Sequence, residues 1–298
     1  MQSIDRKILK IALPSIVSNI TVPLLGLVDT AISGHMGSAV YIGAVAVGSM
    51  IFNVIYWIFG FLRMGTSGMT SQAYGQRNLD GVASLLARSI VVALGIAFII
   101  ILLQTPICNI ALAFINPDSP TALAARTYFS ICIWGAPAML CLYSLTGWYI
   151  GMQNTRLPMM ISILQNVVNI VASLLFVYAL DMNIEGVALG TLTAQWFAIV
   201  VSLLLWTNTY AKRLFHRIRW NNIINGAAMQ RFFTVNRDIF LRVYCIGQLL
   251  FPLCRSSRGY YCACRQHSAY ATIHTLLLCY GWFCICRRGA LWPTVWCW

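Results

Sequence analysis

The sequence predicts an all-α polytopic membrane protein, and three observations support that prediction. Hydrophobic residues make up 59% of the 298 residues and charged residues only 9%, whereas roughly 25% of residues are charged in a soluble domain. Apolar runs such as "SIVVALGIAFIIILLQTPIC" recur, each about as long as a helix that crosses the core of a bilayer. The basic residues fall almost entirely in alternate connections between these runs.

Six membrane spans are expected. They cover about residues 9–33, 40–62, 84–114, 123–149, 157–180 and 187–208. The first run lacks a typical cleavage site and is followed by further spans, so we expect it to remain as a span rather than to be removed as a signal peptide.

The basic residues give the expected orientation of these spans. They lie before span one, between spans two and three, between spans four and five, and after span six, and they include Arg6, Lys7, Lys10, Arg63, Arg77, Arg88, Arg156, Lys212, Arg213, Arg217, Arg219, Arg231 and Arg237. The opposite connections hold Arg126 alone, with the acids Asp118, Asp181 and Glu185. Because basic connections stay in the cytoplasm, both ends of the six-span unit, including the N-terminus, are expected to be cytoplasmic.

The formal net charge of +13 is therefore mostly a consequence of membrane topology. The basic residues are scattered over connections rather than set on one face, which argues against nucleic acid as a partner and for the lipid bilayer. The sequence has no phosphate loop, catalytic-triad spacing or nucleotide motif. We therefore expect neither an enzyme nor an ATP-driven pump, and no cofactor or metal.

Cysteine usage changes near residue 244. Residues 1–243 hold three Cys, whereas residues 244–298 hold eight, together with four Trp, five Arg, no Lys and no acid. We divide the chain accordingly into a six-span lobe at 1–210, a basic cytoplasmic linker at 211–243, and an atypical Cys/Trp/Arg-rich tail at 244–298.

Three interpretations of this tail compete. Its two C-x-C pairs, near His267 and His274, match the C-x₂₋₄-C spacing of structural zinc sites poorly. A disulfide framework conflicts with a tail that begins in the reducing cytoplasm. The interpretation we favour is an out-of-frame translation after a frameshift near residue 243, which explains the unusual residue composition.

An acid lies within span one. A turn of about 100° per residue places small and polar residues on one stripe of that helix. The stripe consists of Ser15, Ser18, Val22, Gly26, Asp29 and Ser33. An acid within a span must pair or face water, so Asp29 is a functional candidate. Pro23, six residues earlier, removes a backbone donor and is expected to act as a hinge. The alternative is that Asp29 lies at the outer end of the span and is simply solvated.

Spans five and six supply polar partners for that acid. Asn166, Asn169 and Ser173 share one face of span five, and Thr191 and Gln195 are one turn apart in span six. These residues either line a cavity or form hydrogen bonds between helices that only hold the bundle together.

Four tryptophans lie near the expected span ends. We expect Trp57, Trp134, Trp148 and Trp206 to form belts at the membrane–water interfaces.

Several short motifs, taken together, resemble the multidrug and toxic compound extrusion (MATE) transporter family, most closely its DNA-damage-inducible F (DinF) branch. They are "PSIVSN" and "VDTAISGHMG" in span one, "TSQAYGQRN" after span two, "GWYIGMQNTRLPM" between spans four and five, and "NIEGVALGT" entering span six. The resemblance covers residues 1 to about 242.

This resemblance implies a transporter of two six-helix lobes in a bacterial inner membrane. Lobes related by an axis along the membrane normal alternate access by rocking against each other. Family members export organic cations and other amphipathic toxicants in exchange for H⁺ or Na⁺. On this basis the chain is one six-helix lobe, the N-terminal half of such a transporter. The alternative is a truncated, non-transporting product, or a chain that needs a second lobe or a dimer.

The resemblance also implies roles for individual residues. Asp29 matches the acid that binds the coupling ion, Asn169 the asparagine beside it, and Thr191 a threonine of span six. Many members carry a second acid where this chain has Ser173, so a relay of one proton is favoured over a charge-rich cation site. We expect Asn169 and Thr191 to donate to the Asp29 carboxylate and Ser173 to bridge through water.

Overall fold

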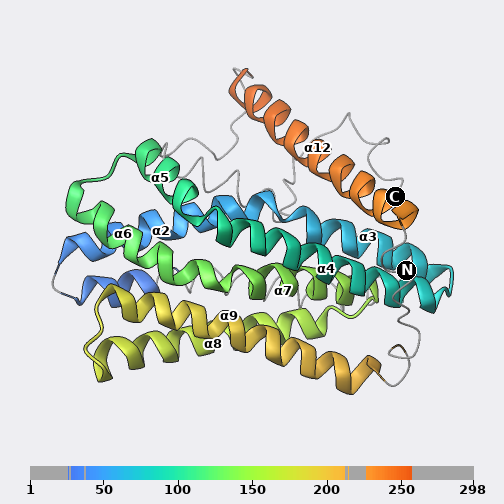
Figure 1. Ribbon diagram of the computed structural model, residues 1–298, viewed down its shortest axis with the longest axis horizontal. Helices are drawn as coiled ribbons and strands as arrows, with labels where there is room; N and C mark the ends of the chain where they lie inside the picture. The colour runs from blue at the N-terminus through green and yellow to red at the C-terminus, as the bar shows by residue number, and fades with distance from the viewer. Residues whose placement is uncertain (1–25, 27, 37, 212–213, 215–225, 257–298) are drawn as a thin grey trace. The chain divides into compact units, whose positions relative to one another are not determined.

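The computed structural model describes residues 26, 28–36, 38–211, 214 and 226–256 (Figure 1). These residues form helices joined by short connections, with no strand among them. The chain divides into two compact units, Met1–Ile239 and Phe240–Trp298. The account below concerns the first unit unless stated.

The described helices follow one another along the chain, and residues 28–34 form the end of a helix before them. The α-helices are α2 (Ala39–Ile58), α3 (Phe61–Gly75), α4 (Leu79–Leu102), α5 (Gln104–Ile115), α6 (Ser119–Cys132), α7 (Ala136–Gly151), α8 (Arg156–Leu174), α9 (Ile184–Trp206) and α12 (Gly226–Ser256). A 3₁₀ turn, η1 (Ile133–Gly135), joins α6 to α7, and π-helical turns η2 (Leu175–Ala179) and η3 (Thr207–Ala211) extend α8 and α9.

Five helical segments are long and apolar enough to cross a membrane. They are Ala39–Gly75, Leu79–Leu102, Ser119–Gly151, Arg156–Ala179 and Ile184–Ala211. The predicted all-α membrane fold is thus confirmed, and these segments correspond to predicted spans two to six. Most of span one lies outside the described residues.

Two predicted span boundaries were wrong. The helix of span two does not end near residue 62, because after a break at Phe59–Gly60 it continues as α3 to Gly75. The predicted span 84–114 is two helices, since α4 ends at Leu102 and α5 follows. The physical reason is Pro106, whose ring in a continuous helix would clash with the carbonyl of Leu102, four residues earlier.

Span three also begins earlier than predicted. The side chain of Asn78 caps α4 by accepting a hydrogen bond from the Gly81 amide at 2.9 Å. Arg88, assigned from the sequence to the preceding connection, therefore lies inside α4 and is only 6% exposed.

Residues in the left-handed backbone conformation follow the ends of four helical segments. Arg77, Asn116, Gln153 and Asp181 have φ between 49° and 61°, and each follows the end of a helical segment. Such a residue reverses the chain within a few positions. Consecutive spans are therefore antiparallel neighbours, as with α8 and α9 (Figure 1).

Glycines let the helices approach closely. A Cβ at Gly147 of α7 would overlap the Arg63 carbonyl oxygen of α3, and a Cβ at Gly48 of α2 would overlap the Tyr128 ring of α6. Small residues at such contacts allow the van der Waals packing that drives helix association in lipid. The pairs α3–α7 and α2–α6 are accordingly among the main contacts of the lobe.

Two of the four tryptophans expected in interfacial belts are buried among the helices instead of exposed toward lipid. Trp148 is fully buried and donates its indole N–H to the Val82 carbonyl at 3.0 Å, and Trp206 is also buried. Trp148 packs edge-on against Tyr149 and Tyr210. It is therefore a core residue that joins α7 to α4.

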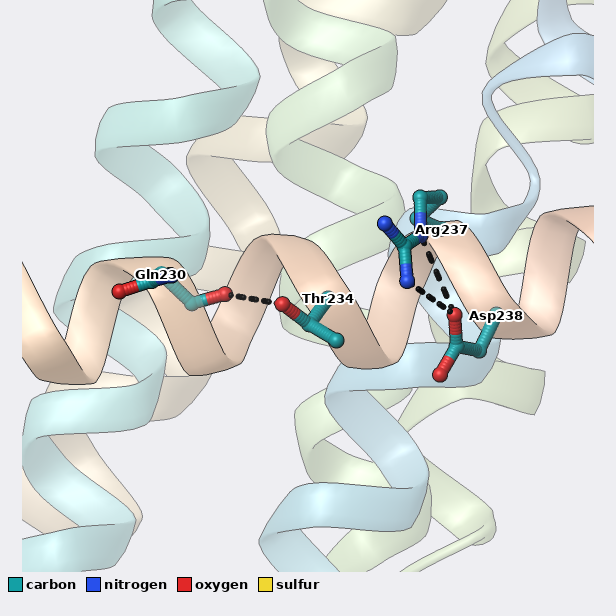
Figure 2. Close-up of polar contacts among 4 residues, drawn as sticks. All are labelled: Gln230, Thr234, Arg237 and Asp238. Atoms are coloured by element: carbon teal, nitrogen blue, oxygen red, sulfur yellow. Dashed lines mark hydrogen bonds and ion pairs between the residues drawn. The ribbon is translucent and has the colours of Figure 1, made fainter.

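The helix α12 crosses the predicted boundary between linker and tail at 243/244 without interruption. Figure 2 shows the local contacts of its first part: Thr234 donates to the Gln230 carbonyl at 2.9 Å, and the Arg237 guanidinium donates to Asp238 Oδ1 at 3.0 and 3.2 Å. Exposed pairs of this kind contribute little to stability. Of the tail at 244–298, residues 244–256 belong to α12, and the rest, including both C-x-C pairs, lies outside the described part.

We expect Gly147→Ala to lower the free energy of unfolding by about 1–3 kcal/mol, because the added Cβ forces α3 and α7 apart. Thermal denaturation in detergent measures the change. Gly95→Ala in α4 is the matched control, since a Cβ there meets no atom within 4 Å. Equal melting temperatures for the two variants would contradict the close-contact argument.

Candidate functional site

A polar cluster lies between α8 and α9. Asn169 Nδ2 donates to Thr191 Oγ1 at 3.3 Å, and Ser173 Oγ lies 3.5 Å from Asn169 Oδ1 as its donor. Thr191 Oγ1 in turn donates to the Val187 carbonyl of its own helix at 3.1 Å. Asn169 is 3% exposed and Ser173 is fully buried. The polar residues predicted to share faces of spans five and six therefore do meet across those helices.

The backbone of α9 makes this cluster compact. A Cβ at Gly190 would overlap Ser173 Oγ and approach the Ser173 backbone nitrogen at 2.7 Å. A Cβ at Gly186, one turn earlier, would come within 3.1 Å of Val177 and Met182, a tight contact rather than an overlap. The "GVALG" segment thus carries two glycines on the face that meets α8, and this brings Thr191 within reach of Asn169.

The carboxyl group of Asp29 takes no part in the hydrogen bonds of the Asn169–Thr191–Ser173 cluster. The residue is half-buried on the helical segment 28–34, and its Oδ1 is a buried atom with no hydrogen-bond partner among the described residues. Its main-chain carbonyl accepts a hydrogen bond from Ser33 Oγ at 2.8 Å. Among the described residues, nothing therefore competes with an ion, a proton or water for this oxygen.

Two residues that the sequence analysis missed link Asp29 to the cluster. Tyr128 and Cys132 of α6 lie within electrostatic range of the Asp29 carboxyl group, and the Tyr128 hydroxyl lies close to the Thr191 side chain. Cys132 Sγ donates to the Ala188 carbonyl of α9 at 3.6 Å. The available signal was their spacing of four residues in "TYFSIC", which places a hydroxyl and a thiol on one helix face.

The predicted donation to Asp29 is not what the described residues show. The Asn169 amide donates to Thr191 and the Thr191 hydroxyl donates to Val187, so one Asn169 N–H and the Thr191 hydroxyl proton are engaged within the α8–α9 pair. Gly26, a cavity candidate, lies exposed, and its carbonyl accepts from Thr30 at 2.7 Å. The other span-one candidates, Ser18 and the hinge Pro23, lie outside the described residues.

The remaining cavity candidates lie one turn from the cluster. Gln195 is 7% exposed and packs directly on Gly135, where a Cβ would overlap its side-chain oxygen. Asn166 is half-buried, and its Nδ2 is a buried atom without a hydrogen-bond partner in the described part of the chain. Both amides thus keep unused hydrogen-bonding capacity inside the lobe.

This set of groups suits the capture of a small cation or proton. The Asp29 carboxyl group lies within electrostatic range of the Tyr128 hydroxyl and the Cys132 thiol, both held on α6. Among the described residues, no group of three or more His, Cys, Asp or Glu side chains is placed to hold a metal ion.

The sequence and fold are similar to those of known proteins. The sequence profile of the MatE family matches residues 14–175. The chain is 38% identical over 254 residues to DNA damage-inducible protein F of Escherichia coli strain K12, a match that covers 85% of the chain and 54% of that protein. It is 30% identical over 217 residues to human multidrug and toxin extrusion protein 1, covering 72% of the chain and 37% of that protein.

A solved structure shows the same fold. A transporter of the MOP superfamily from Pyrococcus furiosus superposes with a TM-score of 0.70 at 18% identity, over 82% of this chain and 54% of that chain. The chain thus spans about half the length of the E. coli relative and of this structure, and less of the human relative.

We expect Thr191→Val to lower the free energy of unfolding by about 1 kcal/mol, because the Asn169 amide loses its acceptor while the side-chain shape is kept. The control is Thr193→Val, since that hydroxyl donates only to the Gly190 carbonyl of its own helix at 2.9 Å. Thermal denaturation of both variants, and of each combined with Asn169→Leu, measures the coupling. Independent effects of Thr191→Val and Asn169→Leu would contradict the bond.

Proposed function

Because the chain belongs to the MatE family of secondary transporters, we propose that it exports small amphipathic or cationic organic compounds in exchange for a cation. The related proteins include multidrug and toxin extrusion transporters, and the fold is that of such transporters. The chain matches only part of each relative, so the activity of the whole transporter is a proposal for this chain.

The observation that carries the proposal is the carboxylate oxygen of Asp29, which is buried and has no hydrogen-bond partner among the described residues. It lies within electrostatic range of Tyr128, whose hydroxyl lies close to the Thr191 side chain. A carboxyl group inside a membrane protein is costly to keep and is tolerated where it pairs, faces water or binds a transported ion. Two neutral groups on α6, the Tyr128 hydroxyl and the Cys132 thiol, lie within electrostatic range of this carboxyl group, and neither is a cation that would neutralise it.

We propose H⁺ as the coupling ion, with Na⁺ as the alternative. A low-dielectric surrounding disfavours a charged carboxylate, so a single acid with neutral neighbours is suited to gain and lose one proton. A charge-rich cation site would need a second acid, and the matching position is Ser173, which is fully buried.

The proposed mechanism couples the charge of Asp29 to the polar cluster. When the lobe opens outward, Asp29 takes up a proton and loses its attraction for a cationic substrate, which leaves. When the lobe opens to the cytoplasm, the proton leaves and the negative site is restored. In the charged state, Asn169 turns an N–H from Thr191 toward the carboxylate, and Thr191 turns its hydroxyl proton there from the Val187 carbonyl. The hinge proposed at Pro23 would let span one move with this exchange.

We propose the bacterial inner membrane as the location, with the N-terminus in the cytoplasm. The basic residues of alternate connections support this orientation. A second lobe, or a second copy of the chain, would complete the transport cavity.

We expect Asp29→Asn to abolish proton-driven dye export, because a side-chain amide cannot take up and release a proton as a carboxyl group does. Dye efflux and intravesicular pH are followed together in proteoliposomes. Asp181→Asn is the matched control: the same chemical change at an exposed turn residue with φ 50°, a conformation that Asn adopts readily. Export by Asp29→Asn at the rate of the unmodified chain would remove this acid from the mechanism.

A second candidate is a chain that inserts in the membrane but does not transport by itself. It is favoured by the coverage of only 54% of the E. coli relative. On this proposal the 298 residues leave cellular dye content unchanged in a strain without other exporters. The coding DNA provides a separate test of the frameshift: a neighbouring frame after residue 243 should encode further membrane spans. Dye export by the chain alone would contradict this candidate.

A further inference from the structure

A second group of polar atoms lies one helical turn from the Asn169–Thr191 pair. The hydroxyl of Tyr56 in α2 lies near the side-chain amide of Gln195 in α9, outside hydrogen-bonding geometry. Tyr56 is 8% and Gln195 7% exposed. Tyr56 Oη and Gln195 Oε1 are both buried atoms without a hydrogen-bond partner among the described residues. Leaving two such atoms dry inside a membrane protein costs free energy.

Asn166 supplies a third group. α8 and α9 are antiparallel, and Asn169 of α8 meets Thr191 of α9. Asn166 lies three residues before Asn169, and Gln195 lies four residues after Thr191, so this register brings Asn166 opposite Gln195. Its Nδ2 is also buried and unpartnered in the described part of the chain. A donor, an acceptor and a hydroxyl that can act as either therefore come from three helices.

The surrounding packing keeps Tyr56 and Gln195 in place. Tyr56 stacks on Phe52 with ring centroids 5.8 Å apart and meets the edge of Tyr143 at 6.3 Å. Gln195 fills the space beside Gly135, at the end of the 3₁₀ turn between α6 and α7.

We propose that Tyr56, Asn166 and Gln195 hold a buried water molecule. This water extends the line of polar groups that begins at the Asn169–Thr191 pair toward the ends of α8 and α9 that meet the basic connections. A buried water typically makes about three hydrogen bonds to groups that otherwise lack partners, and these residues provide three. α8 begins at Arg156 and α9 ends at Trp206, so the water lies on that side of the pair. Its role in releasing the coupling ion to the cytoplasm rests on the function proposed above.

X-ray radiolysis of the full chain in detergent tests the water directly, because hydroxyl radicals form at bound waters and label adjacent side chains. We expect rapid modification of Tyr56. Tyr149 is the internal control: it is fully buried, but its hydroxyl donates to the Ser202 carbonyl at 2.7 Å. In Gln195→Met, which keeps the side-chain shape, the modification of Tyr56 should fall to the level of Tyr149. Equal labelling of the two tyrosines in the unmodified chain would overturn the proposal, as would labelling of Tyr56 that survives Gln195→Met.

Transport assays test the role of the water and are separable from the labelling. In proteoliposomes, Tyr56→Phe and Gln195→Met should lose dye accumulation driven by a pH gradient while keeping dye-for-dye counterflow. Equal loss of both processes would assign the two residues to substrate binding and overturn the ion-path role. If the unmodified chain moves no dye, the proposed function fails, whereas the labelling of Tyr56 still decides whether the water is there.

Discussion

The close approach of α8 and α9 at Gly190 is the contact on which the polar interior depends. In lipid, apolar side chains gain nothing by leaving one apolar surrounding for another, so helices associate through tight packing and internal hydrogen bonds. A side chain at position 190 would displace Ser173 and separate Asn169 from Thr191. The glycine therefore allows hydrogen bonding across two helices that are otherwise apolar toward their surroundings.

In α8 the usual amphipathic pattern is reversed, because apolar residues are exposed and polar residues are buried. Its exposed residues include Met160, Leu164, Val167 and Val171, spaced by three or four positions, whereas Asn169 and Ser173 are buried. In a soluble helix the polar face would be the exposed one. The apolar stripe suits contact with lipid, and polar atoms are satisfied, or retained for an ion or water, inside the lobe.

Much of this arrangement could be predicted because helical periodicity acts within one span. It placed Asn166, Asn169 and Ser173 on one face and Thr191 with Gln195 on another, and α8 and α9 bring these faces together. Periodicity does not show which neighbouring helix a face meets or at what height. Tyr128 was missed for that reason, since only its contact near Thr191 distinguishes it from other aromatic residues in the spans. Trp148 was misassigned because an indole suits a membrane interface and a buried carbonyl partner equally well.

The breaks in the two long spans have a mechanical consequence. α2–α3 and α6–α7 run side by side in the same direction, since Gly48 meets Tyr128 and Gly147 meets Arg63. One span is interrupted at Phe59–Gly60 and the other at Ile133–Gly135, so the upstream halves pair as α2–α6 and the downstream halves as α3–α7. The lobe is thus segmented across its width. The segment that carries Tyr128 and Cys132 can therefore tilt without imposing the same tilt on the segment that carries Trp148. The two ends of the lobe can move separately.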